Sequence, residues 1–344
     1  MILDITQTII NFGNLKDQIR CSQIDKYVYD NSYVYELDTE RKIGQNIIEK
    51  RIFSKLEKLY CNNNGNINDV GHLKETLKVL DCSYGCGINQ TGISQLKYLE
   101  FLDCYNNDRI NDVGHLKDTL KILGCGGKKC AVDQKGISQL KYLEKLDCRD
   151  NSRISDINHL KNTLKILNCN RDCGINQMGL SRLKYLEKII CRDNDKINNV
   201  NHLKNTLKVL DCGRNCGVNQ IGISQLKYLQ KLDCHHNDKI NDVNHLKNTL
   251  KILDCGQDCS VNQIGISQLE YLEYLNAHNN DKINDINHLK NTLKVLYCGG
   301  GCGVDQKGIS ELRFLEYLNY AYNEKISNIN HLKVRNCVSF ERIK

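Results

Sequence analysis

Cysteine and histidine are the residue types in this sequence best suited to metal binding or redox chemistry, and both recur at regular spacing. The chain has 344 residues, of which 19 are cysteines and 10 are histidines. Zinc binding or redox chemistry is one interpretation of the thiols, because the thiolate is a nucleophile and a metal ligand. The other interpretation is structural, since a free cysteine also behaves as a small side chain that is readily buried.

Most of the cysteines fall into three periodic columns. The first is Cys82, Cys125, Cys169, Cys212, Cys255 and Cys298; the second is Cys86, Cys130, Cys173, Cys216, Cys259 and Cys302; the third is Cys61, Cys104, Cys148, Cys191 and Cys234. Ala277 takes the next position of the third column, and each Cys-x-x-x-Cys stands alone in its unit rather than in the paired clusters of a zinc site. The pattern therefore favours buried thiols and predicts no metal and no cofactor.

The tripeptide His-Leu-Lys shares this periodicity. Its histidine recurs every 43 residues, with one interval of 44, at positions 72, 115, 159, 202, 245, 288 and 331. Self-similarity at this period is typical of stacked supersecondary units. We interpret these histidines as structural, together with a column of asparagines whose amides can donate to and accept from buried backbone groups: Asn64, Asn107, Asn151, Asn194, Asn237, Asn280 and Asn323.

Each unit divides into two related halves, for example those that begin at Leu77 and at Leu99; the seven halves of one kind start from Leu56 and the six of the other from Leu77. Both halves follow L-x-x-L-x-C-x-x-(N/G)-x-x-I, so the true repeat is 21 to 22 residues long. In Leu80-Asp81-Cys82, strand alternation directs the leucine and the cysteine inward and the aspartate outward. One short strand cannot bury its own apolar face, and stacking about thirteen of them over residues 56–333 builds a continuous core.

The pattern resembles the leucine-rich-repeat family, and most closely the cysteine-containing subtype of F-box/leucine-rich-repeat proteins. The stretches that carry the resemblance are Ile88-Asn89-Gln90-Thr91-Gly92-Ile93-Ser94-Gln95-Leu96 and Val218-Asn219-Gln220-Ile221-Gly222-Ile223. The resemblance implies an α/β solenoid, a horseshoe with a parallel concave sheet. The units are shorter than is usual in that subtype, so we expect short helical or 3-10 turns on the convex side.

Leucine-rich-repeat proteins generally bind partners on the concave sheet, which the resemblance makes the candidate interaction face here. The varied outward positions supply the candidate residues: Phe101, Asp103, Tyr105, Asp147, Arg149, Arg192, Asp233, His235, Tyr274, His278, Tyr297 and Tyr317. Tyrosine and arginine are enriched in binding hot spots, which favours recognition of a protein partner. The alternative is that these polar residues only keep the sheet solvated.

Residues 1–55 precede the repeats, and residues 334–344 follow them as a tail or cap. The apolar residues Ile9, Phe12, Leu15, Ile19 and Ile24 predict short helices. One interpretation is a cap that shields the first strand. The other is a degenerate F-box that lacks the family's opening Leu-Pro. That resemblance implies binding to Skp1, the adaptor of a cullin ubiquitin ligase.

Composition narrows the functional class. The net charge of +7 comes from 48 basic and 41 acidic residues that are interleaved, so we expect no nucleic-acid partner. We see no secretory signal and no apolar run of about eighteen residues, so we expect an intracellular, cytoplasmic protein with no membrane partner. Because no phosphate loop, HExxH helix or nucleophile motif occurs, we predict a non-catalytic protein-interaction scaffold. The alternative is an F-box-type substrate receptor of a Skp1–cullin ligase.

Overall fold

The fold was analysed in a computed structural model that describes residues 33–39 and 43–339. The chain forms two compact units, Met1–Leu164 and Lys165–Lys344, which are treated separately below. The residues proposed for an F-box-like segment, Ile9, Phe12, Leu15, Ile19 and Ile24, lie outside the described residues. The F-box-like segment therefore stays a prediction.

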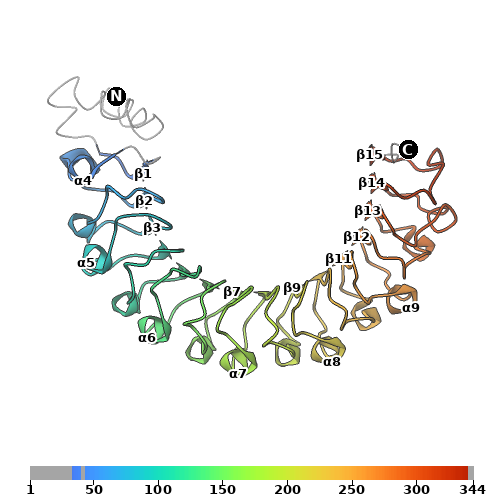
Figure 1. Ribbon diagram of the computed structural model, residues 1–344, viewed down its shortest axis with the longest axis horizontal. Coiled ribbons are helices and arrows are strands. Elements are labelled where there is room, and N and C mark those ends of the chain that lie inside the picture. The colour runs from blue at the N-terminus through green and yellow to red at the C-terminus, as the bar shows by residue number, and fades with distance from the viewer. Residues whose placement is uncertain (1–32, 40–42, 340–344) are drawn as a thin grey trace, which may run out of the picture. The chain divides into compact units, whose positions relative to one another are not determined.

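The first unit is a stack of short parallel strands joined by helical turns (Figure 1). Each strand pairs with the next in chain order, for example with Leu59 opposite Leu80. The strands are β1 (Glu36–Asp38), β2 (Lys58–Tyr60), β3 (Val79–Asp81), β4 (Phe101–Asp103), β5 (Ile122–Gly124) and β6 (Lys145–Asp147). The helical elements are α4 (Gln45–Ile48), η1 (Arg51–Phe53), η2 (Gly71–Leu73), α5 (Gln90–Ile93), η3 (Gly114–Leu116), α6 (Gln134–Ile137) and η4 (Asn158–Leu160).

The second unit repeats the same arrangement, with strands lining the inner side of its curve and helices on the outer side (Figure 1). Its strands are β7 (Ile166–Asn168), β8 (Lys188–Ile190), β9 (Val209–Asp211), β10 (Lys231–Asp233), β11 (Ile252–Asp254), β12 (Tyr274–Asn276), β13 (Val295–Tyr297), β14 (Tyr317–Asn319) and β15 (Asn336–Val338). Its helical elements are α7 (Gln177–Leu180), η5 (Asn201–Leu203), α8 (Gln220–Ile223), η6 (Asn244–Leu246), α9 (Gln263–Ile266) and η7 (Asn287–Leu289). The short convex turns expected from the repeat length are confirmed.

Strand pairing extends beyond residues 56–333 at both ends of the repeat array. In the first unit β1 pairs in parallel with β2, with the buried Leu37 opposite Leu59. In the second unit β15 pairs with β14, with Cys337 opposite Leu318. Backbone pairing needs only an extended segment beside an open strand, so it continues where the cysteine pattern is absent.

Five of the short helices, α5 to α9, begin with a residue whose side chain caps the first turn, and α5, α6, α8 and α9 carry a glycine at a crowded position. In α5 the Asn89 side chain accepts a hydrogen bond from the Gly92 backbone N–H, which satisfies one of the free donors of the first turn. A Cβ atom on Gly92 would collide with the carbonyl oxygen of Asn68 in the preceding repeat. Glycine at this position therefore permits the close stacking of successive repeats.

The interior consists of leucine, isoleucine, valine and cysteine side chains. Every described cysteine is buried except Cys337, which confirms the prediction of buried thiols. Burial raises the pKa of Cys82 and of Cys212 well above the ordinary value, so these groups stay as neutral thiols. The second and third columns also meet, sulfur to sulfur, at 3.4 Å between Cys191 and Cys216. The sequence analysis missed this contact because the two cysteines belong to alternate halves of the repeat.

The asparagine and histidine columns bond to the backbone of the preceding repeat. The amide of Asn237 donates to the carbonyls of Cys212 at 2.9 Å and of Val218 at 3.1 Å, and its oxygen accepts from the Lys239 N–H at 2.9 Å. His245 Nε2 lies 3.0 Å from the carbonyl oxygen of Ile223. The structural interpretation of both columns is confirmed.

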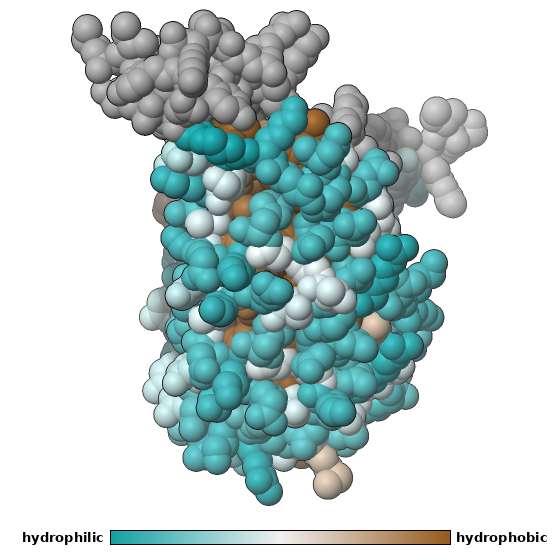
Figure 2. All heavy atoms as spheres, turned by 90° about the vertical axis from the view of Figure 1, so that its left-hand side faces the viewer, coloured by the Kyte–Doolittle hydropathy of each residue, from teal (hydrophilic) through white to brown (hydrophobic). Residues whose placement is uncertain are grey.

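The face of the molecule seen in Figure 2 is covered mainly by hydrophilic residues. Single large apolar side chains are also exposed among the described residues, for example Met178, Ile221 and Ile264. Within the described ranges, the helices are too short or too polar to cross a lipid bilayer.

Candidate functional site

The outward residues of the second unit's sheet form the candidate site. The third residue of each strand points away from the core, because the leucine before it is buried. Strand register places these third residues side by side, in the order Asp211, Asp233, Asp254, Asn276, Tyr297 and Asn319. A continuous polar row therefore lines this part of the concave face.

A cavity of about 450 Å³ opens over this row. We call it the concave pocket. Its lining residues are Arg192, Asp233, His235, Asp254, Gly256, Gln257, Asn276, His278, Tyr297 and Asn319. Five of them were predicted from the sequence as interaction residues: Arg192, Asp233, His235, His278 and Tyr297. The tertiary structure thus gathers residues that lie up to 127 positions apart in the chain (from 192 to 319).

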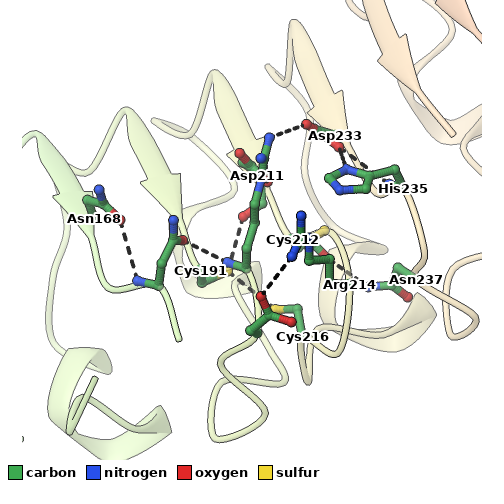
Figure 3. A network of polar contacts seen from close by, with 12 residues as sticks. Asn168, Cys191, Asp211, Cys212, Arg214, Cys216, Asp233, His235 and Asn237 are labelled. Atoms are coloured by element: carbon green, nitrogen blue, oxygen red, sulfur yellow. Dashed lines mark hydrogen bonds and ion pairs between the residues drawn. The ribbon is translucent and has the colours of Figure 1, made fainter. Parts of the chain in front are cut away.

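Arg192 bonds to aspartates of two strands, β9 and β10, at one end of the concave pocket, and both aspartates are labelled in Figure 3. Its Nε donates to Asp211 Oδ1 at 2.6 Å, and an Nη donates to Asp233 Oδ2 at 2.7 Å. The backbone N–H of Arg192 donates to Asn170 Oδ1 at 2.8 Å, which fixes the start of the side chain. The guanidinium is therefore held in one orientation, with about a third of the side chain exposed.

His235 and Asp233 form a second ion pair beside Arg192 (Figure 3). His235 Nδ1 lies 2.5 Å from Asp233 Oδ1. Burial opposes ionisation of Asp233, but the hydrogen bond and charge of His235 and the charge of Arg192 outweigh it and lower the Asp233 pKa. The hydrogen bond to Asp233 in turn raises the pKa of His235, so the histidine tends to carry a positive charge.

Asp254 completes an acidic group at the centre of the concave pocket. Burial, and then the charge of Asp233, raise the pKa of Asp254. Within the described part of the chain, Asp233, His235 and Asp254 form a group whose ligand atoms lie within 4.8 Å of one another and could hold a metal ion. Both oxygens of Asp233 already accept hydrogen bonds, and those of Asp254 accept from Gly256 N–H and from the Asn276 amide. Each carboxylate oxygen of the group therefore has at least one donor from the protein itself.

Three tyrosines flank the concave pocket, and we call them the tyrosine cluster. The rings of Tyr274 and Tyr297 are 5.6 Å apart between centroids, and those of Tyr297 and Tyr317 are 5.2 Å apart. Burial raises the pKa of Tyr274 to about 12, so its hydroxyl stays protonated and available as a donor. All three were predicted from the sequence, and the structure brings them together.

The remaining predicted residues form a separate group on the sheet of the first unit. The Arg149 guanidinium lies 5.2 Å from the Tyr105 ring centroid and 3.4 Å from an Asp147 oxygen. Asp103 accepts a hydrogen bond from the Tyr105 N–H at 2.9 Å, and burial raises its pKa to about 6. Phe101 is half-buried on the same strand as Asp103. The twelve predicted residues are thus divided between the two units.

Five lining residues of the concave pocket were not among the predicted interaction residues: Asp254, Gly256, Gln257, Asn276 and Asn319. Three of them occupy the same strand position as Asp233. Their shared strand position could have identified them from the sequence, because parallel strands in register place equivalent residues side by side.

Comparison with known proteins addresses the fold. No family model and no curated protein sequence matches the chain. Among solved structures, it is similar to the functional domain of InlJ from Listeria monocytogenes, which is described as including a cysteine ladder. That match has 23% identity and a TM-score of 0.59, and it covers 89% of this chain and 68% of the other.

A leucine-rich-repeat protein from Leptospira interrogans matches with 19% identity and a TM-score of 0.53, covering 88% of this chain and 89% of the other. The chain has the leucine-rich-repeat fold. At these identities the likeness concerns the fold alone. The F-box subtype and the nature of the partner therefore remain proposals.

Proposed function

We propose that this leucine-rich-repeat protein is a non-catalytic scaffold that binds a protein partner on its concave face, through the concave pocket and the tyrosine cluster. The observation that carries the proposal is a group of three neighbouring tyrosine rings, one of which lines an open polar cavity that also contains the fixed guanidinium of Arg192. Tyrosine and arginine dominate binding hot spots, since each combines a large contact area with hydrogen-bonding groups.

The charges of the concave pocket give no cationic excess that would favour a nucleic acid. In the lining, Asp233 and Asp254 balance Arg192 and His235, and Asp211, which pairs with Arg192, adds a carboxylate next to the pocket. A partner with a lysine or arginine near an apolar side chain would complement both the carboxylates and the tyrosines.

The pocket lining favours binding over catalysis. None of the lining residues is a serine, cysteine or threonine, and the one hydroxyl in the lining, that of Tyr297, is on β13, three strands from the strand of Asp233. Both members of that pair are already hydrogen-bonded to the protein. The pair therefore acts as part of a fixed recognition surface.

The test is affinity purification of the tagged full chain from its native cell, followed by calorimetry with the purified partner. Tyr297→Ala/Tyr317→Ala is expected to weaken binding at least about tenfold. Met178→Ala is the control, because that side chain is 80% exposed on α7, on the outer side. A partner whose affinity is unchanged by the double tyrosine substitution would refute concave-face binding.

The second candidate is the F-box-type substrate receptor, which is the same scaffold with a working N-terminal module. It is supported by the resemblance of residues 9–26 to the middle of an F-box and by their place ahead of the repeats. This role requires the intracellular location that the sequence predicts. Purified Skp1 should then bind the full chain and lose affinity with Leu15→Ala/Ile19→Ala but not with Lys16→Ala. Failure of the unmodified chain to bind Skp1 would exclude this candidate.

A further inference from the structure

A second surface runs along the side of each unit where the chain enters the strands. An aromatic residue stands three positions before every other strand, and 49% to 58% of its surface is exposed. These are Tyr98 and Tyr142 in the first unit and Tyr185, Tyr228, Tyr271 and Phe314 in the second. At the equivalent position of the alternate halves stands a threonine, as at Thr119 and Thr292. We call this surface the aromatic edge.

The small threonines leave slots between the larger rings. In the first unit a cavity of about 350 Å³ lies between Tyr98 and Tyr142, with Thr119 in its lining. In the second unit a cavity of about 280 Å³ lies between Tyr271 and Phe314, lined by Thr292. The same slot therefore occurs in both units, built from equivalent residues.

Charged side chains border each slot. Lys121 Nζ lies 2.6 Å from a Glu100 oxygen in the first slot, and Lys294 Nζ lies 2.7 Å from a Glu273 oxygen in the second. All four side chains are about half exposed, so each offers both a donor and an acceptor at the border of an apolar slot.

The threonine hydroxyls in these slots take no part in holding the fold together. The Oγ1 atoms of Thr119 and Thr292 are covered and have no hydrogen-bond partner in the described structure. A covered hydroxyl without a partner is unfavourable. It would gain a partner if the side chain rotated about χ1 toward a ligand group in the slot.

We propose that the aromatic edge binds a proline-rich segment of another protein in the polyproline II conformation. Two rings are separated by two strand spacings, which is about 9.6 Å at the sheet. Polyproline II advances about 9.3 Å in each turn of three residues. Prolines one turn apart therefore fall into successive slots without a change of backbone conformation.

The chemistry of the slots fits this ligand. Polyproline II makes no internal hydrogen bonds, so its carbonyls need donors, and lysine ammonium and tyrosine hydroxyl groups supply them. Aromatic-lined grooves are a recurrent means of holding such segments. Glu100 and Glu273 suit basic residues beside the prolines.

The 344 residues of the chain do not supply this ligand. The chain contains no proline, so neither its own termini nor a second copy can supply the segment. The four aromatic residues of the second unit define three intervals, which correspond to a segment of about nine residues.

The test is fluorescence anisotropy with the full chain and a labelled peptide of about nine prolines flanked by arginine. Removal of two ring walls by Tyr271→Ala/Phe314→Ala should weaken binding about tenfold. The variant Thr249→Tyr/Thr292→Tyr should have a similar effect, because it fills the slots. It should still fold, since tyrosine occupies the equivalent position in neighbouring halves, and circular dichroism checks this.

Ile221→Ala/Ile264→Ala is the matched control. These residues are 75% and 79% exposed but lie on α8 and α9, away from the slots, so binding should not change. Tyr297→Ala/Tyr317→Ala should also leave peptide binding intact, which separates this proposal from the concave-face proposal.

Three results would overturn the proposal. The first is no binding of the proline peptide, and the second is equal binding of a glycine–serine peptide of the same length. The third is undiminished binding to the slot-filled variant. If the slot-filled variant still bound the peptide, and a soluble β-linked oligosaccharide displaced the peptide from the chain, the natural ligand would be one that stacks flat on the rings, such as a glycan.

Discussion

The interior columns and the concave face follow the same strands but differ in how much their residues vary. Along the interior, leucine, cysteine and asparagine recur almost unchanged, because each side chain meets the same neighbours in every repeat. On the concave face of the second unit, aspartate, asparagine and tyrosine alternate at one strand position. The repeat therefore constrains the interior by packing and leaves the concave face free to become specific for a partner.

The largest expected effect tests the interior side of this comparison. Asn237→Ala removes the partner of two carbonyls and one N–H in a buried turn, and each buried group left unpaired costs about 1 to 3 kcal/mol. We expect a loss of about 3 to 5 kcal/mol in the free energy of unfolding, measured with denaturant. The exposed Asn241→Ala should change it by less than about 0.5 kcal/mol. Similar stabilities for the two variants would contradict a structural asparagine column.

A smaller effect is expected in the cysteine columns. Cys212→Ser places a hydroxyl in a fully buried apolar site and should cost about 2 kcal/mol. Cys234→Ala should cost only about 1 kcal/mol, because the same column already contains the buried Ala277. Denaturant unfolding measures both, and a stable serine variant would argue against a dry interior.

Thiol reactivity also tests whether the cysteine columns are buried, and it requires no substitution in the interior. In a Cys21→Ser background, Cys337 is the exposed thiol among the described cysteines and should react rapidly with a thiol reagent. The remaining described thiols should react only on unfolding. Rapid labelling of several thiols in the folded protein would show that the interior opens readily.

On the concave face, a substitution should change binding more than stability. Arg192→Ala removes hydrogen bonds to Asp211 and Asp233 at a site that is partly exposed, so we expect a loss of about 1 kcal/mol in stability. Calorimetry with the partner should show that the free energy of binding falls by more than the free energy of unfolding does. A loss of stability like that of Asn237→Ala would mean that Arg192 is mainly structural.

The smallest expected effect is on the pH dependence of stability, and it differs between His235 on the concave face and His245 in the histidine column. Asp233 raises the pKa of His235 above 6.5, whereas burial lowers that of His245 below 6.5. Protonated His235 thus stabilises the fold at low pH, and this contribution is lost as pH rises through its raised pKa. For His245 the neutral form is favoured in the fold, so stability falls as pH drops through its ordinary pKa. NMR titration should find the two midpoints on opposite sides of 6.5, and Asp233→Asn should lower only that of His235.

Several features were predictable because they depend on a single repeat. The recurrence of Leu80-Asp81-Cys82 and its equivalents predicted parallel strands, short turns and buried thiols. Contacts between alternate halves were not predictable in the same way. The approach of Cys191 to Cys216 and the slot between Tyr271 and Phe314 both require the two halves to be placed side by side.

The sequence by itself determined the repeat, its inward and outward residues and the columns that stabilise it, because periodicity and strand alternation act locally. Only the tertiary structure decided that Arg192, Asp233 and Tyr297 line one cavity and that β1 and β15 continue the pairing. The physical reason is that strand register and side-chain orientation, rather than spacing in the chain, set which residues from different repeats meet.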